Sequence, residues 1–231
     1  HCKMTEQTGP PIMEDHKTSS TASSLDRRND LSYAEFKEKY LLARRPVIIT
    51  DATAKWKASS WTPQWFKERY PGKIISTDQG EMRMEDFIDA IVKVSDEPGP
   101  FLREQPLKDV FPDLVDHVEP TPPYVLPNWL GANYLVPPIN KRLNRESHIE
   151  VNFCGRRIFP YLHNDDLGVH AFITQHFGEK EFIIYPPDQE QYLYREGTAR
   201  FSPITDVDKP DLDRYPLFAK AHAIRVVLRP G

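Results

Sequence analysis

A histidine and a carboxylate two positions apart are the first residues in this sequence that could do chemistry. His163 and Asp165 lie in the stretch Tyr161-Leu-His-Asn-Asp-Asp-Leu-Gly. Side chains two positions apart in a β-strand project to the same face, so an imidazole nitrogen and a carboxylate oxygen can reach one ion. Such a pair supplies two members of the two-histidine, one-carboxylate triad that holds Fe(II) and leaves positions open for substrate and O₂. The competing interpretation is an ordinary polar surface turn, because Asn164, Asp165 and Asp166 follow one another.

Lys180 is the second candidate. It follows Gly178 in a Gly-Glu-Lys sequence and precedes the apolar run Phe-Ile-Ile-Tyr-Pro-Pro. An ammonium group that faces the interior of a barrel is costly unless it meets an anion, so this position would suit a dicarboxylate ligand. Gln175, upstream on an expected strand, is a further candidate for lining the same cavity. The competing interpretation of Lys180 is an exposed lysine at a strand edge, which is the more common role of a lone lysine.

The composition limits the classes of function. With 231 residues, of which 39% are hydrophobic, the chain can close one sizeable core, so one folded domain is expected. The net charge of −4 gives no basic excess for nucleic-acid phosphates, so we expect no direct nucleic-acid binding. Two cysteines are too few for a disulfide framework or a cysteine-based zinc site, which favours a reducing compartment, cytoplasmic or nuclear. No run approaches the roughly 18 apolar residues of a membrane span, so no membrane association is expected.

Capping residues and apolar periodicity predict the elements of the first half. Residues 1–30 are rich in Ser, Thr, Pro and charges, which is typical of a disordered tail. Ser32, with Glu35 three residues later, forms a capping box for a helix that should run to about Leu42. The same reasoning predicts a strand at 47–50 and helices at 63–70 and 84–93.

The second half changes character. Ten prolines between Glu97 and Pro138 exclude long helices and indicate an irregular segment with short helical turns such as 107–117. Helices followed by a series of strands indicate an α+β chain whose second half is an antiparallel sheet or barrel. The expected strands of this half are 148–153, 171–177, 181–185 and 223–228.

The order of several motifs resembles the cupin-like JmjC dioxygenases, a family that includes the hypoxia-inducible-factor asparaginyl hydroxylase and the Jumonji lysyl hydroxylases. The resemblance implies a double-stranded β-helix core, the cupin or jelly-roll fold, with an N-terminal helical elaboration. It also implies Fe(II) bound by His163 and Asp165, and 2-oxoglutarate as a co-substrate whose distal carboxylate pairs with Lys180. The motifs are Pro46-Val-Ile-Ile-Thr-Asp, Asn128-Trp-Leu, His163-x-Asp165, and Gly178-x-Lys180 followed by Pro186-Pro-Asp-Gln.

The chain departs from this family at two points. The family's second ligating histidine follows a Pro-Gly-Asp turn, whereas this sequence stops at Pro230-Gly231. We therefore expect a tail at 1–30 and a cupin-like JmjC domain at 31–231 that is incomplete at its C-terminus, with the last strands and the third ligand missing. His222 precedes the strand expected at 223–228 and is a poor substitute for that ligand. Pro160 stands where the family has a hydroxyl residue that helps to hold 2-oxoglutarate.

The resemblance leads us to expect an Fe(II)- and 2-oxoglutarate-dependent oxygenase of the hydroxylase or demethylase type, acting on a C–H bond of a protein or a small molecule. The acidic net charge favours a basic protein or peptide among these substrates. The alternative is a catalytically silent cupin-like binding module, which the departures would explain. A sugar-binding or isomerase cupin would need a denser cluster of histidines. The sequence indicates neither the substrate nor the oligomeric state.

Overall fold

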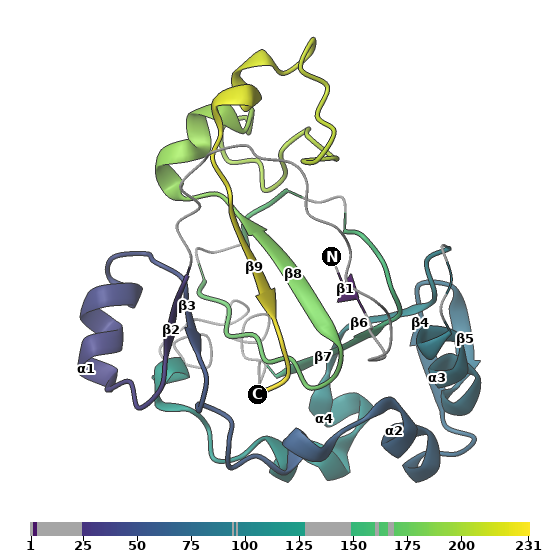
Figure 1. Cartoon of the computed structure of the whole chain (residues 1–231). Helices are drawn as coiled ribbons and strands as arrows, with labels where there is room; N and C mark the ends of the chain where they lie inside the picture. The colour runs from purple at the N-terminus through teal and green to yellow at the C-terminus, as the bar shows by residue number, and fades with distance from the viewer. Residues whose placement is uncertain are drawn as a thin grey trace, which may run out of the picture.

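The structure, a computed structural model, describes residues 2–3, 25–93, 95, 97–127, 149–159, 162–165 and 169–231. The described chain combines short helices with four small sheets (Figure 1). None of the described helices is long and apolar enough to cross a membrane. The α-helices are α1 (Tyr33–Phe36), α2 (Pro63–Arg69), α3 (Met84–Val92) and α4 (Leu107–Val110), and the other helical turns are η1 (Lys37–Leu41), η2 (Lys57–Ser60), η3 (Pro112–Val118), η4 (Pro123–Val125), η7 (Pro187–Tyr192) and η8 (Pro216–Lys220). The strands are β1 (Cys2–Lys3), β2 (Asp26–Arg28), β3 (Val47–Ile49), β4 (Ile74–Thr77), β5 (Gly80–Arg83), β6 (Phe101–Pro106), β7 (Glu150–Cys154), β8 (Glu179–Ile184) and β9 (Ile224–Leu228).

Hydrogen bonds link helix α1 to the parallel strand pair β2 and β3. The Ser32 hydroxyl caps α1 by accepting the Glu35 N–H at 3.2 Å, as the capping box predicts. The Glu35 carboxylate in turn accepts a hydrogen bond from Arg28 on β2 at 2.8 Å. Strand β2 pairs in parallel with β3, so Asp26–Arg28, which the sequence placed in the disordered tail, is instead part of a sheet.

Aromatic residues of α2 form the centre of the hydrophobic core. Thr62 caps this helix and Pro63 starts it, as predicted, and together they fix where Phe66 enters the core. The Phe66 ring lies 5.3 Å from that of Phe111 and 4.7 Å from that of Phe153, which joins the helix to η3 and to β7. The buried cluster around it is Trp56, Ala58, Trp61, Phe66, Ile75, Met84, Phe87, Ile88, Ile91, Leu102, Leu107, Phe111, Leu114, Val118 and Val151.

The strands of the second half form a separate three-stranded sheet in the order β1-β8-β9. Strands β8 and β9 are antiparallel, with Lys180 opposite Leu228 and Ile184 opposite Ile224. The chain between them forms the upper lobe (residues 187–223), which contains η7 and η8 and lies at the top of Figure 1. No residue of β8 or β9 is fully buried, so this sheet lies outside the main core.

The structure confirms a mixed α+β chain but corrects the prediction for its second half. The four described sheets have two or three strands each, and the described residues do not close into a barrel. Residues 171–177 were expected to be a strand, yet they pair with no strand among the described residues, and Phe172 and Ile173 are exposed. Their apolar character therefore did not reflect burial. The Asn128-Trp-Leu motif and Pro160 lie outside the described residues.

Candidate metal centre

The candidate ligands lie on a short extended segment that is paired with the upper lobe. His163 forms an isolated antiparallel bridge with Phe201. The Ser202 N–H donates to the Leu162 carbonyl at 2.8 Å, and the Asn164 N–H donates to the Arg200 carbonyl at 3.1 Å. These two backbone hydrogen bonds, one on each side of His163, give the segment strand geometry without making it part of a larger sheet.

Strand geometry brings the His163 and Asp165 side chains together, as the spacing predicts. The distance from His163 Nε2 to Asp165 Oδ1 is 3.7 Å. Two donors bound to one ion at about 2.1 Å each can lie at most about 4.2 Å apart, so both atoms can reach a single ion. The side chains are 38% and 45% exposed, so both donors are accessible from the solvent. The donor pair therefore fits a divalent transition metal.

The described residues do not supply a third protein ligand. Among them, no three His, Cys, Asp or Glu side chains come close enough to hold a metal together. His222 is exposed, its backbone N–H donates to Gln189 Oε1 in the upper lobe, and among the described residues it forms no ligand group with His163 and Asp165. His170 is likewise exposed.

Lys180 is half-buried against aromatic rings. Its Nζ lies 4.9 Å from the ring centre of Phe182 on the same strand and 5.9 Å from that of Phe159. Cation–π contacts of this kind partly offset the loss of water around an ammonium group. Within the described part of the chain, no carboxylate forms an ion pair with Lys180. Gly178 precedes β8 and has a φ of 69°, a conformation that favours glycine. This accounts for the glycine of the Gly-x-Lys motif.

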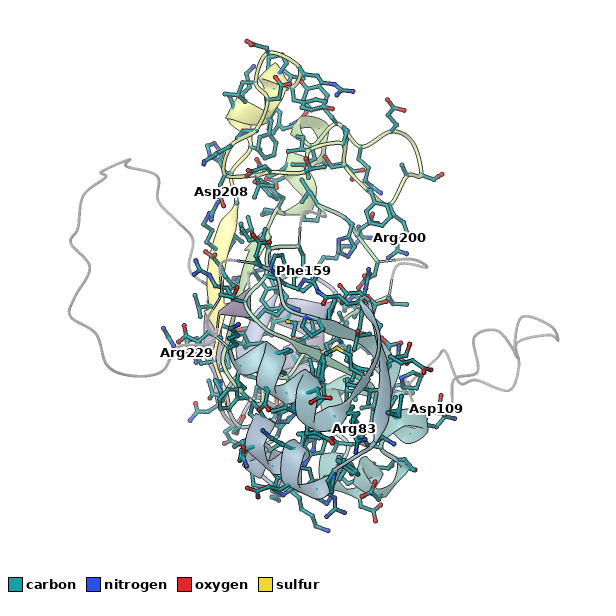
Figure 2. The ribbon with its side chains drawn as sticks, turned by 90° about the vertical axis from the view of Figure 1, so that its right-hand side faces the viewer. Arg83, Asp109, Phe159, Arg200, Asp208 and Arg229 are labelled. Carbon is teal, nitrogen blue, oxygen red and sulfur yellow. The ribbon has the colours of Figure 1, made fainter. Side chains whose placement is uncertain are left out.

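A second cation lies next to Phe159. The Arg157 guanidinium packs 5.7 Å from its ring centre, but both of its terminal nitrogens donate to Asp78 at 2.9 Å, so its charge is neutralised. Figure 2 labels Phe159 near the middle of the molecule, at the level where the helical part meets the upper lobe, with Arg200 at a similar height. Phe159 thus lies close to two cations, of which Arg157 is paired with Asp78 and Lys180 forms no ion pair with another described residue.

Gln175 lies in a different environment. It lines a cavity of about 220 Å³ together with Thr53, Ser59, His176 and the last two residues, and Lys180 is not among its lining residues. The Gln175 amide also donates to the Phe177 carbonyl at 2.6 Å, within its own segment. This cavity gives no support to the expectation that Gln175 and Lys180 line one cavity, which stays a prediction.

Two features of the site were not anticipated from the sequence. The side chain of Asn164, between the two candidate ligands, is held by Arg195 of the upper lobe at 3.0 Å. His176 stacks on Trp56 with ring centres 6.1 Å apart and packs against Trp61, and burial lowers the pKa of its imidazole. The only sequence signal for the first feature was a polar residue between two candidate ligands, on the opposite face of the strand.

Comparisons with known proteins place this geometry in a family. The chain is 22% identical over 233 residues to JmjC domain-containing protein D of Dictyostelium discoideum, covering 87% of this chain and 48% of that protein. It is 24% identical over 220 residues to lysine-specific demethylase 8 of Danio rerio, covering 87% of this chain and 50% of that protein. A 60-residue stretch, 26% of this chain, is 43% identical to tRNA wybutosine-synthesizing protein 5 of Gallus gallus and covers 18% of that protein. The matches thus span half or less of the length of these relatives. The similarity to the first two relatives extends over most of this chain. Because residues 33–231 match the family described as the cupin-like domain, the chain belongs to that family.

Proposed function

We propose that this protein is an Fe(II)- and 2-oxoglutarate-dependent oxygenase. The observation that carries the proposal is the 3.7 Å approach of His163 Nε2 and Asp165 Oδ1, in a chain of the cupin-like family. An imidazole and a carboxylate presented by strand positions two residues apart supply two of the three donors that a facial iron triad requires. The similarity to JmjC proteins over 87% of the chain supports the same chemistry.

Each residue of the site has a distinct role in this proposal. His163 and Asp165 bind the metal, and Lys180 binds the distal carboxylate of 2-oxoglutarate, an anion that would pair with its charge. The Phe159 and Phe182 rings limit water around that ammonium group, which strengthens the ion pair. When bound, the iron would supply the oxidising chemistry that protein side chains lack.

We further propose a protein substrate, modified by hydroxylation or demethylation. The support is the relative whose name is lysine-specific demethylase 8, together with the net charge of −4, which favours a basic peptide. The relative named for tRNA wybutosine synthesis makes RNA the competing substrate. Succinate formation measured with lysine- and arginine-rich peptides and with tRNA distinguishes the two.

Binding of Mn(II), a redox-stable substitute for Fe(II), tests the metal assignment. His163→Ala and Asp165→Ala are each expected to weaken Mn(II) binding by at least tenfold, measured by electron paramagnetic resonance. His170→Ala is the matched control, because this exposed histidine lies close in sequence and should leave the affinity unchanged. Equal affinity of the wild-type and His163→Ala proteins would show that the metal binds elsewhere. Metal binding without any 2-oxoglutarate turnover would favour the catalytically silent binding module.

The third donor is a separate part of the proposal. We infer from the family resemblance that the triad takes a second histidine from a strand that follows a Pro-Gly-Asp turn, and no described residue has that role beside His163 and Asp165. A longer form that includes such a strand is expected to bind Mn(II) more tightly than residues 1–231, because each added donor and its chelation raise the affinity. Equal affinity of the two lengths would mean that residues 1–231 already contain the complete ligand set.

A further inference from the structure

We propose that Arg195 is a positioning residue that fixes the geometry of the His163 and Asp165 donors from outside the metal site. This inference rests on the proposed function, because it assigns Arg195 a role in metal binding. Arg195 lies in the upper lobe, just after η7, and it belongs to none of the motifs that carry the family resemblance.

The first step concerns the residue between the ligands. His163 and Asp165 share one face of the extended segment, so Asn164 projects from the opposite face. Its Oδ1 accepts a hydrogen bond from Arg195 Nη1 at 3.0 Å, and its backbone carbonyl accepts one from Arg200 Nε at 3.3 Å. A fixed Asn164 sets the rotation of the segment about its axis, and that rotation determines where both neighbouring donors point.

The second step concerns what holds Arg195. Its Nη1 also donates to the Ala199 carbonyl at 3.0 Å, and its Nη2 forms an ion pair with the Glu190 carboxylate on η7. The Arg195 side chain is only 21% exposed, so these interactions of its guanidinium are partly shielded from water. The rigid, planar guanidinium therefore links η7, the turn at Ala199 and the segment that carries the ligands.

The third step concerns the backbone contacts of the segment. None of the residues 162–165 belongs to the buried core cluster, and their described backbone hydrogen bonds all go to residues 200–202. Removal of a residue that hydrogen-bonds to a metal-binding segment without contacting the metal commonly weakens metal affinity by about 10- to 100-fold. Arg195 is placed to have an effect of this size without touching the ion.

Two measurements on the full chain test the proposal. Arg195→Gln is expected to weaken Mn(II) binding by about 10- to 100-fold and to speed hydrogen exchange of the Asn164 and Ser202 amides, which are hydrogen-bonded in the pairing. Arg214→Gln, another lobe arginine that packs on Tyr215, is the matched control and should change neither. Arg195→Lys keeps the positive charge but loses the planar set of N–H donors, so its Mn(II) affinity should lie between those of Arg195→Gln and the wild type. It also serves as the test variant if the glutamine substitution fails to fold.

A double-mutant cycle separates positioning from general weakening of the fold. If Arg195 acts through Asn164, then Asn164→Ala should cost about as much Mn(II) affinity as Arg195→Gln, and the double variant should be little worse than either. Unchanged amide exchange in Arg195→Gln, or losses that simply add, would overturn the proposal. The role of Arg195 would also be overturned if Arg195→Gln exchanged these amides faster but kept its Mn(II) affinity. If His163→Ala then abolished Mn(II) binding, the proposed metal site would still stand. If His163→Ala also binds normally, the proposed function itself fails.

Discussion

Lys180 is a half-buried cation whose described neighbours are aromatic rings rather than carboxylates. Lys180→Ala is expected to weaken 2-oxoglutarate binding by about 10- to 150-fold, since a charged hydrogen-bonding partner contributes roughly 1.5–3 kcal/mol. Mn(II) affinity should be nearly unchanged, because the lysine is not a metal ligand. Isothermal titration of both ligands checks this, with the exposed Lys220→Ala as control. Parallel loss of both affinities would indicate that Lys180 supports the fold instead.

His176 is expected to make stability depend on pH. Burial against the Trp56 and Trp61 rings lowers its pKa below the ordinary 6.5, although a hydrogen bond with the Ala58 backbone opposes the shift. The unfolded chain therefore takes up a proton more readily than the folded one. The stability contributed by the neutral ring is present above about pH 6.5 and is lost as the pH falls through the lower, folded-state pKa.

His176→Gln should flatten this dependence, measured as the free energy of unfolding in urea from about pH 8 to about pH 5. Some dependence should remain, because burial also lowers the pKa of His117, which accepts a hydrogen bond from Trp61. His170→Gln, at an exposed histidine, should leave the profile unchanged. A His176→Gln profile as steep as that of the wild type would place the titrating group elsewhere.

For single residues, the sequence predicted those contacts that depend on local spacing. Alternation along a strand was enough to predict that His163 and Asp165 approach each other. It could not predict Arg195 as a partner of Asn164, because the two residues are 31 positions apart and meet only through the path of the upper lobe. The ring contacts of His176 are equally non-local.

Among the elements, α2 shows how a cap supports the core. The Thr62 hydroxyl accepts the Trp65 N–H at 3.1 Å, and the helix that starts there carries Phe66 into the core. Thr62→Ala is expected to lower the free energy of unfolding by about 1 kcal/mol. Thr198→Ala, in an exposed turn of the upper lobe, is the control and should change it by less than about 0.5 kcal/mol. Chemical denaturation measures both, and an equal effect would show that the cap contributes nothing specific.

The elements also mark the limits of sequence reasoning. Helices α1 and α2 begin where the sequence indicated, because the Ser32 and Thr62 caps are local. Helix α3 begins at Met84, as its apolar periodicity predicted, although its N-cap residue Arg83 makes no side-chain cap hydrogen bond. The polar Asp26–Arg28 segment forms a strand because β3 offers it a parallel partner, and its composition gives no sign of that. Residues 171–177 had strand composition but no described partner. In both cases pairing decided the outcome rather than propensity.

On the scale of the whole molecule, the core and the candidate metal pair are separate. Phe66 is 2% exposed and touches five aromatic neighbours, whereas His163 and Asp165 belong to no core cluster. Phe66→Ala is expected to cost about 3–5 kcal/mol of unfolding free energy through lost burial and the cavity it leaves. Mn(II) affinity, measured on the folded fraction at low temperature, should change little. Phe172→Ala, at a 37% exposed phenylalanine, is the control and should be nearly neutral. A large loss of Mn(II) affinity in Phe66→Ala would contradict the separation of core and site.

The pairing of the ligand segment with residues 200–202 has a consequence for the order of folding events. Asn164 and Arg200 are 36 positions apart, so their contact requires the closure of a long loop. Loop closure costs chain entropy before any contact offsets it, and such contacts form slowly. The aromatic cluster around α2 depends on long-range contacts as well, because Phe111 and Phe153 lie 45 and 87 positions from Phe66. Metal added early in refolding should therefore meet His163 and Asp165 on a segment that residues 200–202 do not yet hold in its extended form, and metal binding should tighten only after that loop has closed.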